Sequence, residues 1–297
     1  MNIIERKEGV YTHFAMTPLE NPIGYLLIEL PHGSTTTNDF QWYQGNLQGD
    51  YPPNIIDFFY VNTDVGSPEI AFEIAQQLRD NYEVHILRSH IPRTFIDCNR
   101  VVGEGISYSE GGVTPATPSY VTNKSDIEFL YASYHAYQNY VKGLYAKICG
   151  EQAGLALMLH TYAPRSVPIT KVDHDIVEQL HAFYNTEKIE DCKLRPEVDI
   201  IHKTPDGEVL IDKTMIQNIT EQFESAGFEV QNGASYPLHP VTTAHYHAQQ
   251  NPLQTLCLEV RRDLVVSTWS PFEEMNISKE KAQRIASCIA QAIPTRS

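Results

Sequence analysis

Three polar side chains stand at the ends of apolar runs, where an open α/β sheet would bind a ligand. His32 and His160 each follow such a run, and Glu259 comes at the end of one. The runs, which predict strands, cover residues 25–30, 155–159 and 253–258. Burying a histidine or a glutamate there costs free energy unless the side chain finds a partner, and ligands bind at the carboxyl ends of strands in such sheets. Each residue alone is more often structural, but the three together favour a functional site.

Two neutral histidines and a carboxylate are the ligand set of a hydrolytic zinc centre, which keeps a fourth position for water. A second carboxylate that is not a ligand, here Glu259, would act as general base. The carboxypeptidase spacing His-x-x-Glu fails, because Thr35 stands three residues after His32. The candidates for the acidic ligand are Asp39, Asp57 and Asp64. Asp64 precedes a predicted helix at residues 67–80, so it could face the strand ends or, equally well, cap that helix.

Residues 93–100 read Arg-Thr-Phe-Ile-Asp-Cys-Asn-Arg and place two arginines close together. One arginine, with Asn99 nearby, could hold a substrate carboxylate in a bidentate fork, and the other could stabilise a developing oxyanion. A charge-assisted hydrogen bond of this kind contributes about 1.5–3 kcal/mol. The alternative is an ordinary ion pair of Arg100 with Asp97 or Glu104.

The composition limits the classes of partner. The 297 residues include 22 Lys and Arg against 37 Asp and Glu, a formal net charge of −15. Such a charge repels nucleic-acid phosphates, and an anionic substrate would need a local arginine cluster. No apolar run reaches the roughly 18 residues of a membrane span, and the charged start, residues 1–8, is unlike a secretory signal. Five scattered cysteines without a C-x-x-C pair indicate free thiols and a cytoplasmic location.

Apolar runs alternate with helical periodicities, which predicts an α/β fold with a mostly parallel or mixed sheet covered on both faces. Further strands are predicted at residues 83–87 and 94–98, and helices at 67–80, 126–149, 173–184, 213–226 and 278–292. We expect Ser125 to cap the second helix in a capping box with Glu128, and Gly227 to end the fourth. Residues 101–123, with four glycines and two prolines, are a surface loop or, alternatively, a mobile loop over the site. We expect one domain over residues 1–297.

Eight short motifs follow one another along residues 31–264. They are Pro31-His32-Gly33-Ser34, Thr63-Asp64, the segment 93–100, Leu159-His160-Thr161-Tyr162, Arg195-Pro196, Asp206-Gly207, Thr243-Ala-His245-Tyr246 and Leu258-Glu259-Val260-Arg261-Arg262. In their order and rough spacing they resemble the N-formylglutamate amidohydrolase family, whose members are distant relatives of zinc carboxypeptidases.

The resemblance implies a carboxypeptidase-like domain with three layers, α/β/α, around a mixed, mostly parallel sheet. It also implies a Zn²⁺ ion held by His32, Asp64 and His160, which decides the question of Asp64. Glu259 would be the general base. Further implied are substrate or oxyanion contacts from Arg93, Asn99 and Arg100, and a pocket lined by Thr243, His245 and Tyr246.

Several departures from the family pattern lie near these residues. The family's Asp two residues before the second histidine is Met158 here, so His160 needs another orienting partner. The order Ser-Gly is reversed to Gly33-Ser34, the glycine after His-Tyr is His247, and residues 236–240 read Tyr-Pro-Leu-His-Pro. Because these changes lie near the substrate, they bear on specificity more than on chemistry.

We therefore expect hydrolysis of an amide bond in a small acidic N-acyl amino acid, similar to N-formylglutamate, or in a short peptide. Glu259 would take a proton from a zinc-activated water and pass it to the leaving nitrogen, and Arg93 would stabilise the oxyanion. Arg100 with Asn99 would hold a substrate carboxylate. Two alternatives stay open: a zinc carboxypeptidase or amidase acting on a peptide or γ-glutamyl substrate, and a catalytically silent binding protein. We expect no nucleic-acid or membrane partner, and the oligomeric state stays open.

Overall fold

The computed structural model describes residues 1–103 and 113–294. Its strands are β1 (Asn2–Lys7), β2 (Tyr11–Met16), β3 (Gly24–Leu30), β4 (Tyr82–Ser89), β5 (Leu155–Tyr162), β6 (Arg165–Ser166), β7 (Lys193–Leu194), β8 (Val198–Ile201), β9 (Val230–Gln231) and β10 (Thr255–Arg261). Its α-helices are α1 (Thr37–Asn46), α2 (Ile55–Asn62), α3 (Ser67–Leu78), α4 (Lys124–Tyr145), α5 (Ile176–Tyr184), α6 (Lys213–Ser225), α7 (Thr243–Gln250) and α8 (Lys279–Ala292).

Four parallel strands form the centre of the large sheet. Within the described residues the strand order is β1-β2-β4-β3-β5-β10-β8-β9. Strands β4, β3, β5 and β10 run parallel to their neighbours in this group, whereas β2 pairs antiparallel with β4 and β8 antiparallel with β10. The sheet is therefore mixed with a parallel centre, as predicted, and the carboxyl ends of β3, β5 and β10 meet at one edge.

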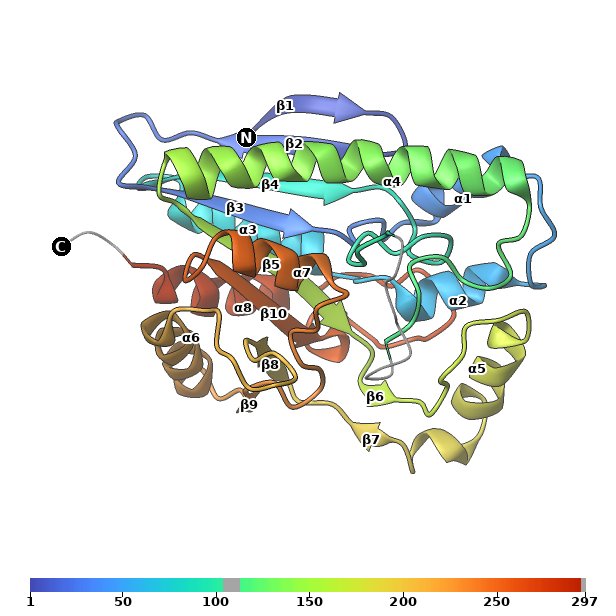
Figure 1. Ribbon diagram of the computed structural model, residues 1–297. Coiled ribbons are helices and arrows are strands. Elements are labelled where there is room, and N and C mark those ends of the chain that lie inside the picture. Colours follow the sequence, from blue (N-terminus) through green and yellow to red (C-terminus); the bar gives the residue numbers. More distant parts are fainter. Residues whose placement is uncertain (104–112, 295–297) are drawn as a thin grey trace.

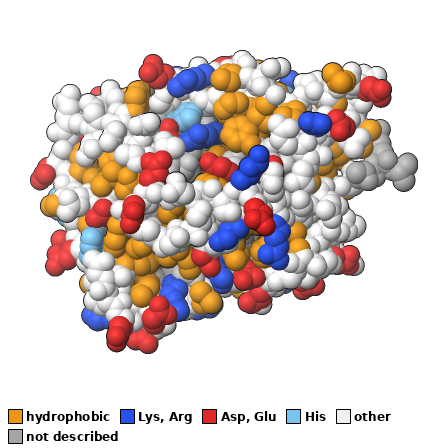
Figure 2. Space-filling view, turned by 180° about the vertical axis from the view of Figure 1, so that it is seen from behind, with side chains coloured by type: hydrophobic (Ala, Val, Ile, Leu, Met, Phe, Trp, Pro, Cys, Tyr) orange, Lys and Arg blue, Asp and Glu red, His pale blue; other side chains and the backbone are white. Residues whose placement is uncertain are grey.

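Helices cover both faces of the sheet and complete the predicted α/β/α layers. Helix α4 crosses the face seen in front, and α3 and α8 lie behind the sheet (Figure 1). Apolar residues of α3, α6 and α8 form one hydrophobic core with the sheet, and those of α1, α2, α4 and α5 form the other. Seen from behind, acidic and basic side chains are interspersed with hydrophobic ones (Figure 2).

The alternation of side chains along the strands decides which residues face each layer. Leu157 and Leu159 of β5 belong to the core under α3 and α8, whereas Ala156 packs in the core under α4. Because successive side chains of a strand point to opposite faces, His160 lies on the α4 side. Glu259 is the Cα partner of His160 in the parallel β5–β10 pair, so both side chains leave the sheet on the same face.

Two sequence-based predictions are wrong. Residues 94–98 form no strand; the amides of Phe95 and Ile96 both donate to the carbonyl of Pro92, which folds the segment into turns. The two side chains are buried in the core under α4, so their apolar character reflects packing without pairing. Helix α4 is capped by Asn123 instead of Ser125, because the Asn123 Oδ1 atom accepts hydrogen bonds from the amides of Ser125 and Asp126.

The other predicted elements are present with shifted ends. Helix α4 passes into a π-helical turn at Ala146–Glu151, and α5 begins three residues later than predicted. Gly227 follows α6 with a φ of 84°, the left-handed backbone conformation that glycine adopts most readily. Residues 104–112 of the proposed mobile loop lie outside the described residues. None of the described helices is both long enough and apolar enough to cross a membrane.

Candidate metal centre and active site

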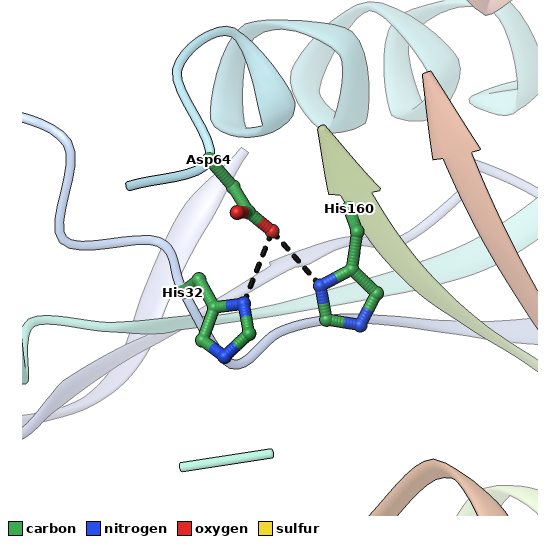
Figure 3. Close-up of side chains that lie close together, drawn as sticks. All are labelled: His32, Asp64 and His160. Carbon is green, nitrogen blue, oxygen red and sulfur yellow. Dashed lines mark hydrogen bonds and ion pairs between the residues drawn. The ribbon is translucent and has the colours of Figure 1, made fainter. Parts of the chain in front are cut away.

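Three predicted ligands converge at the carboxyl edge of the sheet. His32 lies just after β3, Asp64 lies in the connection between α2 and α3, and His160 belongs to β5. One potential ligand atom from each residue lies within 4.8 Å of the other two. Figure 3 shows the Asp64 carboxylate between the two imidazoles. All three residues are buried, so few water molecules compete for these atoms.

The two imidazoles present the same nitrogen to Asp64. Its Oδ2 atom lies 3.2 Å from Nδ1 of His32 and 2.8 Å from Nδ1 of His160. The outer nitrogens face other side chains: Nε2 of His32 contacts Asp97 Oδ1 at 2.7 Å, and Nε2 of His160 lies 3.4 Å from Nδ2 of Asn99. Two imidazole nitrogens and one carboxylate that face a common point fit the donor set of a hydrolytic zinc site. The side chain next to Nε2 of His160 is thus the amide of Asn99, and no carboxylate of the described residues lies within 4.0 Å of that nitrogen.

The sequence suggests Asp97 only as an ion-pair partner of Arg100, but in the structure this carboxylate has several further contacts. Besides His32, Asp97 contacts Nη2 of Arg93 at 2.9 Å and Nη1 of Arg100 at 3.6 Å. Burial opposes the charge on Asp97, but Arg100, Arg93 and His32 hold its pKa well below the usual range. A carboxylate that contacts the outer nitrogen of a metal-binding histidine fixes the orientation and tautomer of the ring.

Arg262 also lies at the site, although no feature of the sequence predicted its contact with Asp64. Its guanidinium is buried and lies 3.6 Å from Asp64 Oδ1, and it also donates to the carbonyls of Thr161 and Val61. Burial lowers the pKa of Arg262 to about 10, although Asp64 raises it. The motif Glu-Val-Arg-Arg contains this residue, but only the fold shows that Arg262, which directly follows β10, lies next to Asp64.

Electrostatics keep Asp64 ionised. Burial alone would raise its pKa, but His32 and His160 hold the pKa of this carboxyl far below its usual range. Nη1 of Arg93 adds a further positive charge 4.0 Å from Asp64 Oδ1. The carboxylate is therefore available as a ligand at neutral pH.

Glu259 lies beside this cluster without joining it. Its Oε2 atom is buried and has no hydrogen-bond partner among the described residues, while the residue as a whole is partly accessible to solvent. Burial raises the pKa of Glu259 to about 7, and the neighbouring His160, Arg195 and Arg93 oppose this shift. A carboxyl group whose pKa lies near neutrality is suited to accept and return a proton.

Asn99 and Thr243 connect the metal cluster to helix α7. Oδ1 of Asn99 accepts hydrogen bonds from the Thr243 hydroxyl at 3.0 Å and from the Ala244 amide at 3.2 Å. Arg100 donates to the carbonyls of Thr114 and Asn99. These contacts place the start of α7 next to the segment that carries Asp97 and Asn99.

The remaining two predicted pocket residues lie farther along α7. His245 is buried, which is the main reason that its pKa is lowered. Tyr246 is 36% exposed, and its ring lies under the Lys142 ammonium of α4 at 5.3 Å. The ring of Tyr246 therefore packs against Lys142 of α4 and against its neighbour His247.

Comparison with known proteins agrees with this architecture. A sequence profile of the N-formylglutamate amidohydrolase family matches residues 61–266, a range that includes Asp64, His160 and Glu259 and begins after His32. Among solved structures, the chain is similar to N-formylglutamate amidohydrolase from Ralstonia eutropha, with 15% sequence identity, coverage of 95% of this chain and 96% of that chain, and a TM-score of 0.56. It is also similar to a gene product from Agrobacterium tumefaciens, with 15% identity, coverage of 91% and 88%, and a TM-score of 0.54.

No curated protein sequence matches the chain significantly. At 15% identity, the two solved structures show a shared fold, which is the three-layer α/β arrangement described above. The family profile extends from α2 to just beyond β10, which is more than half of the chain. The chain therefore belongs to the N-formylglutamate amidohydrolase family.

Proposed function

We propose that this chain is a zinc-dependent amidohydrolase that cleaves the amide bond of an acidic N-acyl amino acid, similar to N-formylglutamate. One observation carries the proposal: the potential ligand atoms of His32, Asp64 and His160 lie within 4.8 Å of one another, and Glu259 occupies the neighbouring strand position on the same face. Family membership independently supports hydrolysis of an amide.

His32, Asp64 and His160 would hold the metal through Nδ1, a carboxylate oxygen and Nδ1. A zinc ion held there supplies Lewis acidity, which polarises an acyl carbonyl and lowers the pKa of water. Asp97 holds the outer nitrogen of the His32 ring, so this imidazole needs no reorientation to bind the metal. This preorganisation supports metal binding by the folded protein.

Glu259 is the proposed general base. Its unpaired Oε2 atom can take a proton from the attacking water, and the same carboxyl can then give the proton to the leaving nitrogen. Because the proton returns to the substrate, Glu259 ends the cycle ionised, as it began. The pKa of about 7 supports both transfers.

The arginines are the proposed contacts for negative charge. Arg93 keeps its side chain 25% exposed while Nη2 is held by Asp97, which suits a group that stabilises the oxyanion of the tetrahedral intermediate. Arg100 with Asn99 would bind the α-carboxylate of the substrate. Thr243, His245 and Tyr246 are proposed to line the pocket, Thr243 through its hydrogen bond to Asn99.

The proposed setting is a reducing compartment such as the cytoplasm. All five cysteines are buried and free, although Cys98 lies directly beside Asn99. Free thiols of this kind are typical of proteins that are not exposed to an oxidising environment. The proposed partner is a small anionic metabolite, because the net charge of −15 disfavours binding to a polyanion.

A substrate panel tests the proposal. The purified protein, loaded with zinc and separately stripped by a chelator, is assayed with N-formyl-L-glutamate, N-succinyl-L-glutamate and a dipeptide that ends in glutamate. We expect zinc-dependent release of formate and glutamate. Release of amino acids from the dipeptide alone would support a peptidase instead, and no hydrolysis of any substrate by the zinc-loaded protein would contradict amide hydrolysis.

A further inference from the structure

Arg195, between β7 and β8, is held in a fixed position near the site. Its Nη1 atom donates to the carbonyl of Ala163 at 2.9 Å and its Nη2 atom to the hydroxyl of Tyr236 at 2.9 Å. The guanidinium lies near two aromatic rings, 5.3 Å from the centroid of Tyr162 and 5.8 Å from that of Tyr236. A guanidinium held in this way loses little conformational freedom when it binds a ligand.

The two tyrosines beside Arg195, Tyr162 and Tyr236, are themselves held in place. The hydroxyl of Tyr162 donates to the carbonyl of Pro196 at 2.7 Å, and the Arg261 guanidinium donates to the carbonyl of Arg195 at 3.0 Å. The loop before Tyr236 is held by the buried carboxylate of Asp199. That carboxylate accepts hydrogen bonds from the amides of Gly233, Ala234 and Ser235.

Arg195 differs from the other arginines of the site in its charge balance. Arg93, Arg100 and Arg262 each lie within 4.0 Å of Asp97 or Asp64. In the described part of the chain, no carboxylate lies within 4.0 Å of Arg195. In a chain with a net charge of −15, a positioned guanidinium without an acidic partner indicates an anionic ligand.

The position of Arg195 fits the far end of a short substrate. Ala163, which accepts its hydrogen bond, stands three residues after His160, a distance of roughly 10 Å at about 3.3 Å per strand residue. Burial raises the pKa of Glu259 and the guanidinium of Arg195 is among the groups that act against this rise, so Arg195 lies within electrostatic range of the proposed base. Arg93 lies 4.0 Å from Asp64, so it remains available to stabilise the negative charge that develops at the reacting carbonyl.

We propose that Arg195, with the Tyr236 hydroxyl as a second donor, binds the side-chain carboxylate of the substrate's amino acid. This inference rests on the proposed function and adds the residues that select the substrate. Through Arg195 and Tyr236, N-acyl derivatives of glutamate or aspartate would be preferred over those of neutral amino acids. The Tyr236 hydroxyl accepts from Arg195 and keeps its own proton to donate to the carboxylate. A planar guanidinium and a phenol together offer a carboxylate two directed hydrogen bonds.

The test compares N-formyl-L-glutamate with N-formyl-L-glutamine, which differ only in the charged oxygen of the side chain. Arg195→Met is expected to lower kcat/KM for the glutamate substrate roughly 10- to 100-fold, the value of one charge-assisted hydrogen bond, chiefly through KM. The glutamine substrate should change less than about threefold. Arg195→Lys should restore part of the preference, because it keeps the charge but not the planar fork.

Arg165→Met is the matched control. Arg165 also donates to backbone carbonyls and lies two residues after Ala163, but its charge is paired with Glu190. This variant makes the same change in net charge as Arg195→Met. It should leave the ratio of the two kcat/KM values, for the glutamate and the glutamine substrate, unaltered. If Arg195→Met lowered kcat/KM equally for both substrates, or for neither, the inference would be wrong.

A binding measurement separates this inference from the proposed function. Calorimetric titration with L-glutamate and L-glutamine, the two products, requires no turnover. A wild-type preference for glutamate that disappears in Arg195→Met supports the inference even if no substrate is hydrolysed. Hydrolysis without an Arg195-dependent preference in either measurement would leave the proposed function standing and would overturn the inference.

Discussion

The carboxylate of Asp64 serves more than one purpose. Oδ2 contacts both imidazoles, while Oδ1 lies 3.6 Å from the buried Arg262. Breaking a buried ion pair by removing one partner costs about 3–5 kcal/mol, because the other charge stays buried and uncompensated. Substitution of Asp64 would therefore damage folding as well as metal binding, and the variants that isolate the chemistry are found at Glu259 and Asp97.

Glu259→Gln should greatly slow turnover without loss of metal. The amide cannot take a proton from water, so we expect kcat to fall by about 10²- to 10⁴-fold. The side chain makes no hydrogen bond to His32, Asp64 or His160, so zinc stoichiometry should stay that of the wild type. Kinetics with metal analysis check this; wild-type kcat in the variant would remove Glu259 from the mechanism.

Asp97→Asn should weaken zinc binding roughly 10- to 100-fold, as loss of an orienting carboxylate does at other metal sites. Competition with a chelator of known affinity measures the change. Asp57→Asn is the matched control, since Asp57 contacts His181 at 2.7 Å in another histidine–aspartate pair away from the cluster. An equal effect of both substitutions would show that Asp97 has no specific role at the metal.

At the scale of elements, strand β3 and helix α4 are joined through a buried acid of β3. Glu29 in β3 accepts hydrogen bonds from Tyr137 at 3.1 Å and from Tyr145 at 2.9 Å, both on α4. Burial raises the pKa of Glu29 to about 7, against the opposing effect of the two hydroxyls. The strand that delivers His32 is thus joined to α4 by a carboxyl group that titrates near neutrality.

Glu29→Gln should stabilise the protein in a pH-dependent way. The carboxyl of Glu29 has its ordinary pKa of 4.5 in the unfolded chain and a pKa of about 7 in the folded chain. The wild type therefore loses stability as the pH rises from about 4.5 to 7, and the variant does not. The variant should gain about 2 kcal/mol relative to the wild type between pH 5 and pH 8. Urea unfolding at both pH values measures it.

Glu5→Gln provides the comparison for this prediction. Glu5 also accepts a hydrogen bond from a tyrosine, Tyr11, but it is exposed at the edge of the sheet. Its substitution should show no comparable dependence on pH. If the two variants behaved alike, the pH dependence would not arise from the burial of Glu29.

At the scale of the whole molecule, the metal cluster joins distant parts of the chain. Its three residues come from the end of β3, the α2–α3 connection and β5, and Asp64 lies between segments that belong to both cores. A ligand that binds only the folded state stabilises it by about 2.7 kcal/mol at 100 times its dissociation constant. Metal removal should therefore affect global stability as well as activity.

We expect chelation to lower the thermal midpoint of the wild type by roughly 5–10 °C, at about 2–4 °C per kcal/mol for a protein of this size. Differential scanning calorimetry with and without zinc measures the shift. His160→Ala should show a much smaller difference between the two conditions. A wild-type midpoint that does not respond to zinc or chelator would mean that no metal binds these residues tightly.

The parts of the site that the sequence predicts are those tied to the ends of strands. His32, His160 and Glu259 could be located because apolar runs mark strands and parallel strands end at one edge. The convergence of Asp64 depends on the path of the α2–α3 connection, which periodicity does not describe, and only the family resemblance pointed to it. The strand predicted at residues 94–98 is absent, because buried apolar residues in turns, here residues 95 and 96, have the same sequence pattern as a short strand.

Arg195 and Arg262 show the same limit for charged residues. Each lies in a motif that the sequence contains, but the guanidinium of Arg262 is paired with a buried aspartate and that of Arg195 lies beside two tyrosines. That distinction depends on contacts between residues about 40 to 200 positions apart in the chain. Residue type and spacing indicate that cations are available, and only the fold shows which of them is free to bind an anion.

Anomalous diffraction at the zinc absorption edge, from crystals of the zinc-loaded protein, is the most direct test of the central claim. We predict one strong peak per chain, within bonding distance of Nδ1 of His32, Nδ1 of His160 and a carboxylate oxygen of Asp64, with Glu259 nearby but not coordinated. The absence of a peak at these three residues, or a peak bound by other side chains, would contradict the account.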